Sequence, residues 1–263
     1  MTDWKRRVKH FLGRTIFFTG LHRLLLRQRG VIVLFHRVDD RLKGNPLSCT
    51  RSEFVSFCRF FGRYFEVIPL GDLLDRIEDG ADVGGTLVIT FDDGYLDNRE
   101  TAAPILRDHG LPACFFVASG FVGSPTIPWW DAELGVNSEW MSWSNLKELV
   151  DMGFEVGAHT VNHVDLGVVH GEEARNEIVN SGQQIHEHLG VPVPLFSYPY
   201  GREHQMTDEN RKVVREAGYR CCPSAFGGEV TKDSDPFYLR RFPVSTWITS
   251  PYHLGWEILF GNR

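Results

Sequence analysis

Cysteine is scarce in this chain, and the few cysteines are not arranged as a metal site or a disulfide framework. The 263 residues include five, two of them adjacent: Cys49, Cys58, Cys114, Cys221 and Cys222. None forms a Cys-x-x-Cys motif, and an odd number does not suit a set of paired disulfides. We therefore expect most of these thiols to fill the core of a protein in a reducing compartment.

Long apolar runs are also missing. The runs near the N-terminus are far too short to span a bilayer, and Arg14, His22 and Arg23 interrupt any signal-peptide core. The sequence contains no internal repeat, low-complexity tract or linker rich in proline and serine. We expect one domain over residues 31–263, preceded by an extension at residues 1–30, in a cytoplasmic protein that is either free or peripheral to the inner membrane.

Positive charge is scarce outside that extension. Residues 1–29 contain eight Lys or Arg and one acid, Asp3, which leaves 20 basic and 33 acidic residues in the rest of the chain. An acidic body with a basic N-terminal segment is not typical of a nucleic-acid-binding protein. We expect no nucleic-acid partner.

The extension combines basic and apolar side chains, and two interpretations of it stay open. Its apolar residues include Trp4, Phe11, Phe17 and Phe18. A basic amphipathic helix within residues 4–29 would rest on the surface of an anionic membrane. Alternatively, the helix packs on the domain and its arginines are solvated.

The body of the chain alternates between strand-like and helix-like patterns, which predicts an α/β fold. This alternation implies parallel strands joined by helical crossovers, in an open sheet or a barrel, with the chemistry at the carboxyl ends of the strands. The expected strands are 31–35, 86–91, 113–117, 154–158, 195–198, 219–223 and 238–244. The expected helices are 52–64, 70–78, 98–109, 144–152, 172–189 and 208–217.

Two polar motifs follow expected strands. Asp92 and Asp93 come directly after the apolar run 86–91, where Asp-Asp-Gly either makes a plain turn or supplies one carboxylate for a metal and one for a proton. His159 and His163 follow the strand at 154–158, at a spacing that puts both rings on one face if the segment begins a helical turn. A carboxylate and two imidazoles at the ends of strands favour a shared metal site.

An insert at residues 126–143 is rich in tryptophan and follows the expected strand at 113–117. Exposed tryptophans there would provide stacking platforms for sugar rings. The alternative is that two or more of them are buried in a small core of the loop itself. The four are Trp129, Trp130, Trp140 and Trp143.

Together these segments resemble a known family. Thr-Phe-Asp-Asp-Gly, His-Thr-x-x-His and Ser-Tyr-Pro-Tyr-Gly, in this order, resemble the polysaccharide deacetylases of carbohydrate esterase family four. The segments 34–38 and 103–117 resemble its bacterial branch that includes poly-N-acetylglucosamine deacetylases. The resemblance implies a distorted (β/α) barrel of about seven strands. It also implies metal-dependent hydrolysis of the acetyl amide of an N-acetylated sugar, in an envelope polysaccharide or its lipid-linked or nucleotide-linked precursor.

The resemblance also assigns residues to roles. Asp93, His159 and His163 would ligate the metal, and Asp92 would be the general base. Zn²⁺ suits these ligands, and Co²⁺, Ni²⁺ or Fe²⁺ would fit the same set. The backbone N–H of Tyr200, after Pro199, would donate to the oxyanion, although the same residues would also make a plain turn. We also expect Tyr95, with Tyr200 and Pro199, to contribute to the substrate-binding part of the site.

Two departures from the family pattern concern the remaining roles. Ser197 stands where many members have an arginine that orients the base; Arg241 either replaces it from a late strand or is solvated at the surface. In the family, the catalytic acid is usually a late histidine in a Leu-x-x-His pattern, and this sequence lacks that pattern. His253 comes late in the chain but stands in Pro-Tyr-His-Leu, so it is a weak candidate. His36, after the first strand, either protonates the leaving amine or holds the substrate, or else caps the strand structurally.

Two other functions agree with parts of this pattern. A catalytically inactive carbohydrate-binding module of the same fold would keep the pocket, although the intact acids and imidazoles count against it. A non-haem iron oxygenase also uses two histidines and a carboxylate, but those enzymes have all-β scaffolds that the alternating pattern does not resemble.

Overall fold

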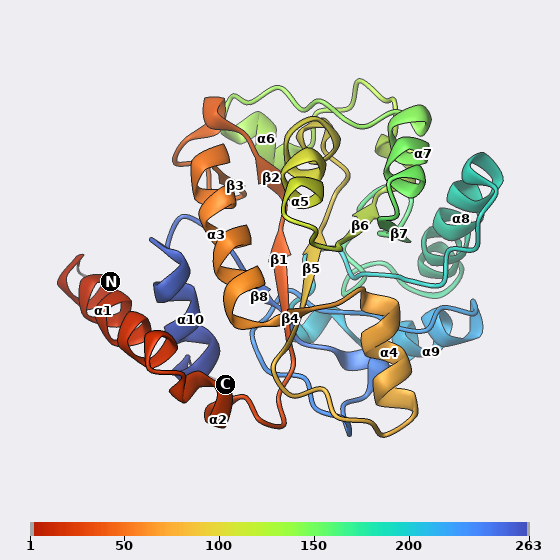
Figure 1. Ribbon diagram of the computed structural model, residues 1–263. Coiled ribbons are helices and arrows are strands. Elements are labelled where there is room, and N and C mark those ends of the chain that lie inside the picture. Colours follow the sequence, from red (N-terminus) through yellow and green to blue (C-terminus); the bar gives the residue numbers. More distant parts are fainter. Residues whose placement is uncertain (1–2, 262–263) are drawn as a thin grey trace.

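The computed structural model describes residues 3–261 and has a parallel sheet at its centre, surrounded by helices (Figure 1). The sheet has the strand order β7-β6-β5-β1-β8, and β4 pairs with the start of β5. The strands are β1 (Val31–Phe35), β4 (Glu66–Val67), β5 (Thr86–Phe91), β6 (Cys114–Val117), β7 (Glu155–Ala158) and β8 (Phe242–Pro243). A two-residue pair, β2 (Arg37–Val38) and β3 (Ser48–Cys49), lies beyond β1.

The central strands form because their residues are apolar on both faces. Every residue of β1, β5 and β6 is buried, as expected for parallel strands that are covered on both sides. The rings of Phe35, Phe91 and Phe115 stack across these three strands, with centroids 5.5 and 4.9 Å apart. The bounds predicted for β1 and β5 are therefore confirmed.

Single bridges continue the sheet into a ring. Ala158 pairs with Phe196, Leu195 with Cys221, and Pro223 with Leu239; the segment after Leu239 then becomes β8, which pairs with β1. Among residues 3–261, seven segments thus follow one another around a distorted (β/α) barrel, as the sequence predicted.

Three predicted strands were wrong in extent. Residues 195–198 and 219–223 form only isolated bridges, and the strand predicted at 238–244 is reduced to β8. Proline explains the loss, because it cannot donate to a ladder of hydrogen bonds and it occurs at positions 194, 199, 223, 236 and 243.

Helices cover the barrel and mostly begin and end near their predicted positions. They are α3 (Arg51–Tyr64), α4 (Leu70–Glu78), α5 (Ala103–Asp108), α6 (Trp129–Glu133), α7 (Trp143–Asp151), α8 (Gly171–Leu189) and α9 (Asp208–Glu216). Short helical turns lie at Asp40–Leu42, Asn98–Ala102, Ser119–Phe121, Glu203–Gln205 and Pro236–Tyr238.

The helix predicted at 98–109 is divided, with a π-helical turn at Asn98–Ala102 before α5. Pro104, which has no N–H for a regular hydrogen bond, lies at this junction.

The sequence did not predict α10 (Pro251–Phe260). Its own apolar side chains lie on nearly every side of this helix, so its sequence shows little of the periodicity that marks a surface helix. Its start does carry a signal, since Ser250 caps the N-terminus and Pro251 takes the first position.

The N-terminal residues form α1 (Asp3–Phe18) and α2 (Leu21–Leu25), and α1 packs lengthwise against α10 (Figure 1). The two backbones touch at Gly13, where an added Cβ would lie 2.1 Å from the carbonyl oxygen of Tyr252. Phe17 is buried against Phe60 of α3. No helix within residues 3–261 is both long and apolar enough to cross a membrane.

The five cysteines are free, and four of them are buried. This agrees with their expected place in the core.

Adjacent phenylalanines test how firmly α1 belongs to the fold. Phe17 is 1% exposed and Phe18 is 76% exposed. Phe17→Ala should lower the free energy of unfolding by about 3–5 kcal/mol, because it leaves a cavity, whereas Phe18→Ala should change it by less than about 0.5 kcal/mol. Urea denaturation measures both, and equal effects would contradict the packing of α1 described here.

Candidate active site

The two polar motifs meet at the carboxyl end of the barrel. Asp92 and Asp93 follow β5, and His159 follows β7. One ligand atom from each of Asp93, His159 and His163 lies within 4.8 Å of the others, and all three side chains are buried. The Asp-Asp-Gly segment also makes the expected turn, since Gly94 donates its N–H to the carbonyl of Asp92. The turn and the cluster are therefore two properties of the same residues.

Left-handed backbone conformations concentrate at this cluster. Between residues 3 and 261, the non-glycine residues with positive φ are Asp93 (75°), Thr160 (60°), His163 (53°) and Tyr200 (59°). Such conformations are unfavourable for residues with a Cβ and occur mainly at functional sites. They also correct one prediction, because His159 and His163 are brought together by a strained loop and not by a helical turn.

Helix α8 holds this loop in place. Glu177 accepts hydrogen bonds from the N–H groups of Val161 and Asn162, at 2.9 and 2.8 Å. The hydroxyl of Ser181 donates to the carbonyl of Thr160 at 2.8 Å. No short motif in the sequence marks Glu177 or Ser181 for this purpose, since they lie more than a dozen residues from the histidines.

One ring nitrogen of each histidine lies beside Asp93. His159 Nδ1 lies 2.8 Å from the carbonyl oxygen of Ser197, and since a carbonyl can only accept, this nitrogen carries the proton. His159 Nε2 lies 3.5 Å from Asp93 Oδ1, and His163 Nε2 lies 3.2 Å from the same oxygen. Burial raises the pKa of Asp93, but the two imidazoles outweigh burial and bring it well below its usual value.

Arg241 holds the other aspartate. Its guanidinium is fully buried and binds Asp92 in a bidentate manner, with Nη1–Oδ1 at 2.8 Å and Nη2–Oδ2 at 2.6 Å. Nη2 also donates to the hydroxyl of Ser197 at 2.9 Å, and Nη1 to that of Thr90 at 3.1 Å. The structure thus excludes solvation of Arg241 at the surface. It places Arg241 against Asp92, with Ser197 filling the space beside it.

This ion pair decides the protonation state of Asp92. Burial would raise the pKa of Asp92, but the charge of Arg241, together with His159, outweighs burial and lowers it. Asp92 is therefore a carboxylate at neutral pH.

A cavity of about 270 Å³ opens over these groups. Its lining includes Asp92, Asp93, both imidazoles and His36, and Trp129, Trp130 and Tyr200 contribute aromatic rings. Trp130 lies 4.7 Å and Tyr200 4.8 Å from the ring of His163, measured between centroids.

The other two tryptophans of the insert do not line this cavity. Trp140 is buried against Tyr95 and Phe121, and Trp143 stacks on His188. Of the four, only Trp140 is buried, so the structure does not show a small core of two or more tryptophans; Trp129 is exposed, as the other interpretation expects.

Tyr200 and Pro199 lie beside the cavity in a tight turn, in which Gly201 donates its N–H to the carbonyl of Pro199. Pro199 is buried, and the ring of Tyr200 lines the cavity. Among the described residues, none accepts a hydrogen bond from the N–H of Tyr200.

His36 faces the cavity, and a hydrogen bond to its backbone carbonyl holds it in place. Asn98 donates to the carbonyl of His36 at 2.7 Å. Burial lowers the pKa of the His36 ring, and the charges of Asp93 and Asp92 compensate only in part. His253, by contrast, is buried in α10 against Glu257 and does not line the cavity.

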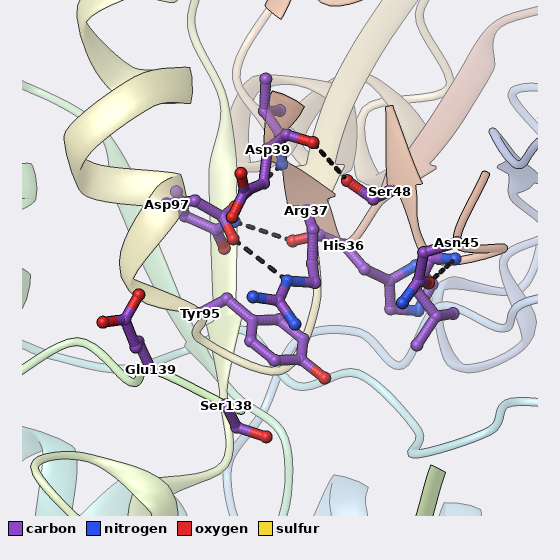
Figure 2. Close-up of polar contacts among 12 residues, drawn as sticks. His36, Arg37, Asp39, Asn45, Ser48, Tyr95, Asp97, Ser138 and Glu139 are labelled. Carbon is purple, nitrogen blue, oxygen red and sulfur yellow. Dashed lines mark hydrogen bonds and ion pairs between the residues drawn. The ribbon is translucent and has the colours of Figure 1, made fainter. Parts of the chain in front are cut away.

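A buried charge network that the sequence did not predict supports the wall of the cavity. Figure 2 shows Arg37 reaching Asp97, at 3.2 Å, and lying over the ring of Tyr95. Arg37 also contacts Asp131, which accepts a hydrogen bond from the hydroxyl of Tyr95 at 3.0 Å. A sequence offers no signal for such a network, because its members are separated by 36 to 94 positions.

The placement of Tyr95 corrects its predicted role. It is fully buried and does not line the cavity. Its hydroxyl accepts the indole N–H of Trp130 at 2.9 Å, so Tyr95 positions the aromatic wall and does not touch a ligand.

Solved structures share this fold. IcaB from Ammonifex degensii matches with a TM-score of 0.74 and 22% identity, over 88% of this chain and 97% of that chain. PplD from Streptococcus pyogenes, solved in complex with acetate, matches with a TM-score of 0.71 and 18% identity, over 86% and 96% of the two chains. The fold is therefore that of known deacetylases.

Sequence comparison gives the family. The chain belongs to the polysaccharide deacetylase family, whose sequence model matches residues 79–222. It is 24% identical over 216 residues to YxkH of Bacillus subtilis, which is named after the same family, covering 81% of this chain and 71% of that protein. It is 26% identical over 208 residues to the poly-beta-1,6-N-acetyl-D-glucosamine N-deacetylase of Staphylococcus aureus, covering 75% and 68%. These matches confirm the resemblance seen in the motifs.

Removing Arg241 should destabilise the fold, because the buried carboxylate of Asp92 loses its ion pair. Arg241→Met should lower the free energy of unfolding at pH 7 by about 3–5 kcal/mol, because Asp92 is left without its partner. In the folded wild type the pKa of Asp92 is lower than its value of about 3.9 in the unfolded chain. Ionisation of Asp92 therefore stabilises the wild-type fold above about pH 3.9. This stabilisation is lost as the pH falls through the folded-state pKa. The difference in unfolding free energy between wild type and variant should therefore narrow as the pH falls, because Asp92 is protonated first in the variant, where burial raises its pKa, and in the wild type only at lower pH. Denaturant titrations at several pH values measure it, and a constant difference would contradict the ion pair.

Proposed function

We propose that this protein is a metal-dependent deacetylase that hydrolyses the acetyl amide of an N-acetylated sugar in a cell-envelope polysaccharide or its precursor. Membership of the polysaccharide deacetylase family supports hydrolysis of acetyl groups on sugars. The observation that carries the finer proposal is the convergence of Asp93, His159 and His163 beside an aspartate that Arg241 keeps ionised.

The three clustered residues fit a divalent cation. Asp93 Oδ1 is buried and lies close to both imidazoles, yet it accepts no hydrogen bond of ordinary geometry from any residue that the structure describes. Two nitrogens and one carboxylate oxygen form a ligand set that suits Zn²⁺, and also Co²⁺, Ni²⁺ or Fe²⁺, and leaves coordination positions open. A cation bound there lowers the pKa of a coordinated water and polarises the acetyl carbonyl.

Asp92 is the proposed general base. It lines the cavity beside Asp93, it is ionised, and Arg241 fixes the direction of both its oxygens. A base held in this way accepts a proton from the attacking water without having to reorient. Arg241 does not line the cavity and therefore acts as a positioning residue.

The remaining polar groups suit the later steps. The free N–H of Tyr200 donates to the negative charge that develops on the acetyl oxygen. His36, which lines the cavity, protonates the leaving amine or holds the sugar. Trp129, which is 58% exposed, and Trp130 offer flat apolar surfaces to a sugar ring. The name of the Staphylococcus aureus relative supports an N-acetylhexosamine glycan as substrate.

Acetate release tests the proposed function directly. We expect the protein with added Zn²⁺ to release acetate from an N-acetylhexosamine oligosaccharide, and a chelator to abolish the release, because the cation supplies the Lewis acid. A panel of N-acetylated oligosaccharides and sugar nucleotides, assayed with and without chelator and without oxygen, identifies the substrate class. Bound metal with no acetate from any member of the panel would favour a non-catalytic carbohydrate-binding module of the same fold.

Two kinds of variant separate the base from the ligands. Asp92→Asn should lower kcat by roughly 100- to 10,000-fold through the loss of the base, with Zn²⁺ still bound. Asp93→Ala and His159→Ala should lose both activity and Zn²⁺ binding, as measured by isothermal titration calorimetry. Unchanged kcat in Asp92→Asn would remove Asp92 as the base, and full Zn²⁺ affinity in Asp93→Ala would remove Asp93 as a ligand.

A further inference from the structure

Helices α1 and α2 carry apolar side chains that point away from the protein. Five of them are strongly exposed, and we call them the docking face: Trp4 (69%), Phe11 (68%), Phe18 (76%), Leu21 (46%) and Leu24 (66%). Trp4, Phe11 and Phe18 follow one another at intervals of seven residues, or about two helical turns, so they form one stripe along α1.

The docking face is not the face by which α1 joins the fold. The inner side of the helix carries Gly13 and Phe17, which are buried, together with Lys9, which bonds Glu257 at 2.6 Å, and His10, which lies 2.6 Å from the hydroxyl of Ser250. A helix that serves only the core has polar residues on its outer side. Here exposed apolar residues lie beside basic ones on the outer side, a pattern typical of a surface that contacts a second partner.

The charges around this face indicate what that partner is. Lys5, Arg14, Arg23 and Arg27 are exposed, and within residues 3–261 none of them forms an ion pair with a described side chain. Residues 1–29 contain eight basic residues and one acid, whereas the rest of the chain is acidic. A surface that combines aromatic and leucine side chains with unpaired cations is complementary to the boundary between acyl chains and anionic headgroups.

A second copy of this chain fits less well. A two-fold dimer brings the same patch of both copies together, so it would set one basic face against another. Like charges at that distance oppose such an association.

We propose that the docking face binds the surface of an anionic lipid bilayer. The aromatic rings and leucines enter the interface between headgroups and acyl chains, and the flanking cations pair with lipid phosphates. Because α1 is already fixed against α10, binding requires no folding of a disordered segment, and the ordering entropy is small. The helices lie on the membrane without spanning it.

This mode of binding leaves the cavity open. Figure 1 shows α1 and α2 at the lower flank of the barrel, whereas α6, whose tryptophans line the cavity, lies at the opposite end. The bound protein therefore does not cover its active site with lipid.

Vesicle co-sedimentation of the full chain tests the proposal without any catalytic assay, so its failure and the failure of the deacetylase proposal are independent. The wild type should bind vesicles of phosphatidylcholine mixed with phosphatidylglycerol and should bind phosphatidylcholine alone much more weakly. Phe11→Ser/Phe18→Ser should lower the partition coefficient roughly 100-fold, since two exposed rings can no longer enter the interface. Arg14→Glu/Arg23→Glu should weaken binding to the anionic vesicles only, and added salt should do the same to the wild type.

The matched control is Leu134→Ser/Val168→Ser, which removes two equally apolar side chains, 54% and 70% exposed, from other parts of the surface. It should bind like the wild type, and thermal melts should show all variants to be folded. Three results would overturn the proposal: no sedimentation with either vesicle, equal binding to both compositions, or a lipid-free dimer that Phe11→Ser/Phe18→Ser converts to a monomer. The last would assign the face to a second copy.

Discussion

The pairing of a buried carboxylate with a buried guanidinium governs the arrangement of this active site. Asp92 lies in the interior of the barrel end, where an uncompensated charge would be strongly unfavourable. Arg241 comes from the segment that leads into β8, and β8 pairs with β1, which in turn pairs with β5. The same closure of the barrel that completes the core therefore brings the positive charge to Asp92. It leaves Asp93, the neighbouring residue, free to face the imidazoles.

Two adjacent aspartates can have different functions here because the backbone separates them. Asp92 still follows the direction of β5, whereas Asp93 adopts a left-handed conformation that turns its side chain toward His159 and His163. The histidine loop is strained in the same way and is held by α8 through Glu177 and Ser181. Such strain is stable only where the surrounding fold determines it, as at a preformed site for a ligand.

The barrel and the cluster of Asp93, His159 and His163 could both be predicted from the sequence because of the properties of buried parallel strands. Buried parallel strands are continuous apolar runs, so β1 and β5 could be bounded to the residue, and parallel strands present their carboxyl ends together, so Asp93 and His159 could be expected to meet. What could not be predicted depends on contacts distant in sequence: the bidentate grip of Arg241, the network around Arg37, and the isolated bridges that replace the late strands. The apolar residues of α10 occur on nearly all its sides, so the sequence carried no periodic signal for this helix. The spacing of His159 and His163 alone could not distinguish a helical turn from the left-handed loop.

X-ray absorption at the zinc edge of the loaded protein is the most direct test of the central claim, which is that three side chains from two separate segments bind one cation. The account predicts a first shell of nitrogen and oxygen at about 2.0–2.1 Å, with the outer-shell scattering of two imidazoles and no sulfur. The same experiment on Asp92→Asn should give the same two imidazoles, because Asp92 is held by Arg241 and is not a ligand. A shell without imidazole, or one containing cysteine sulfur, would contradict it.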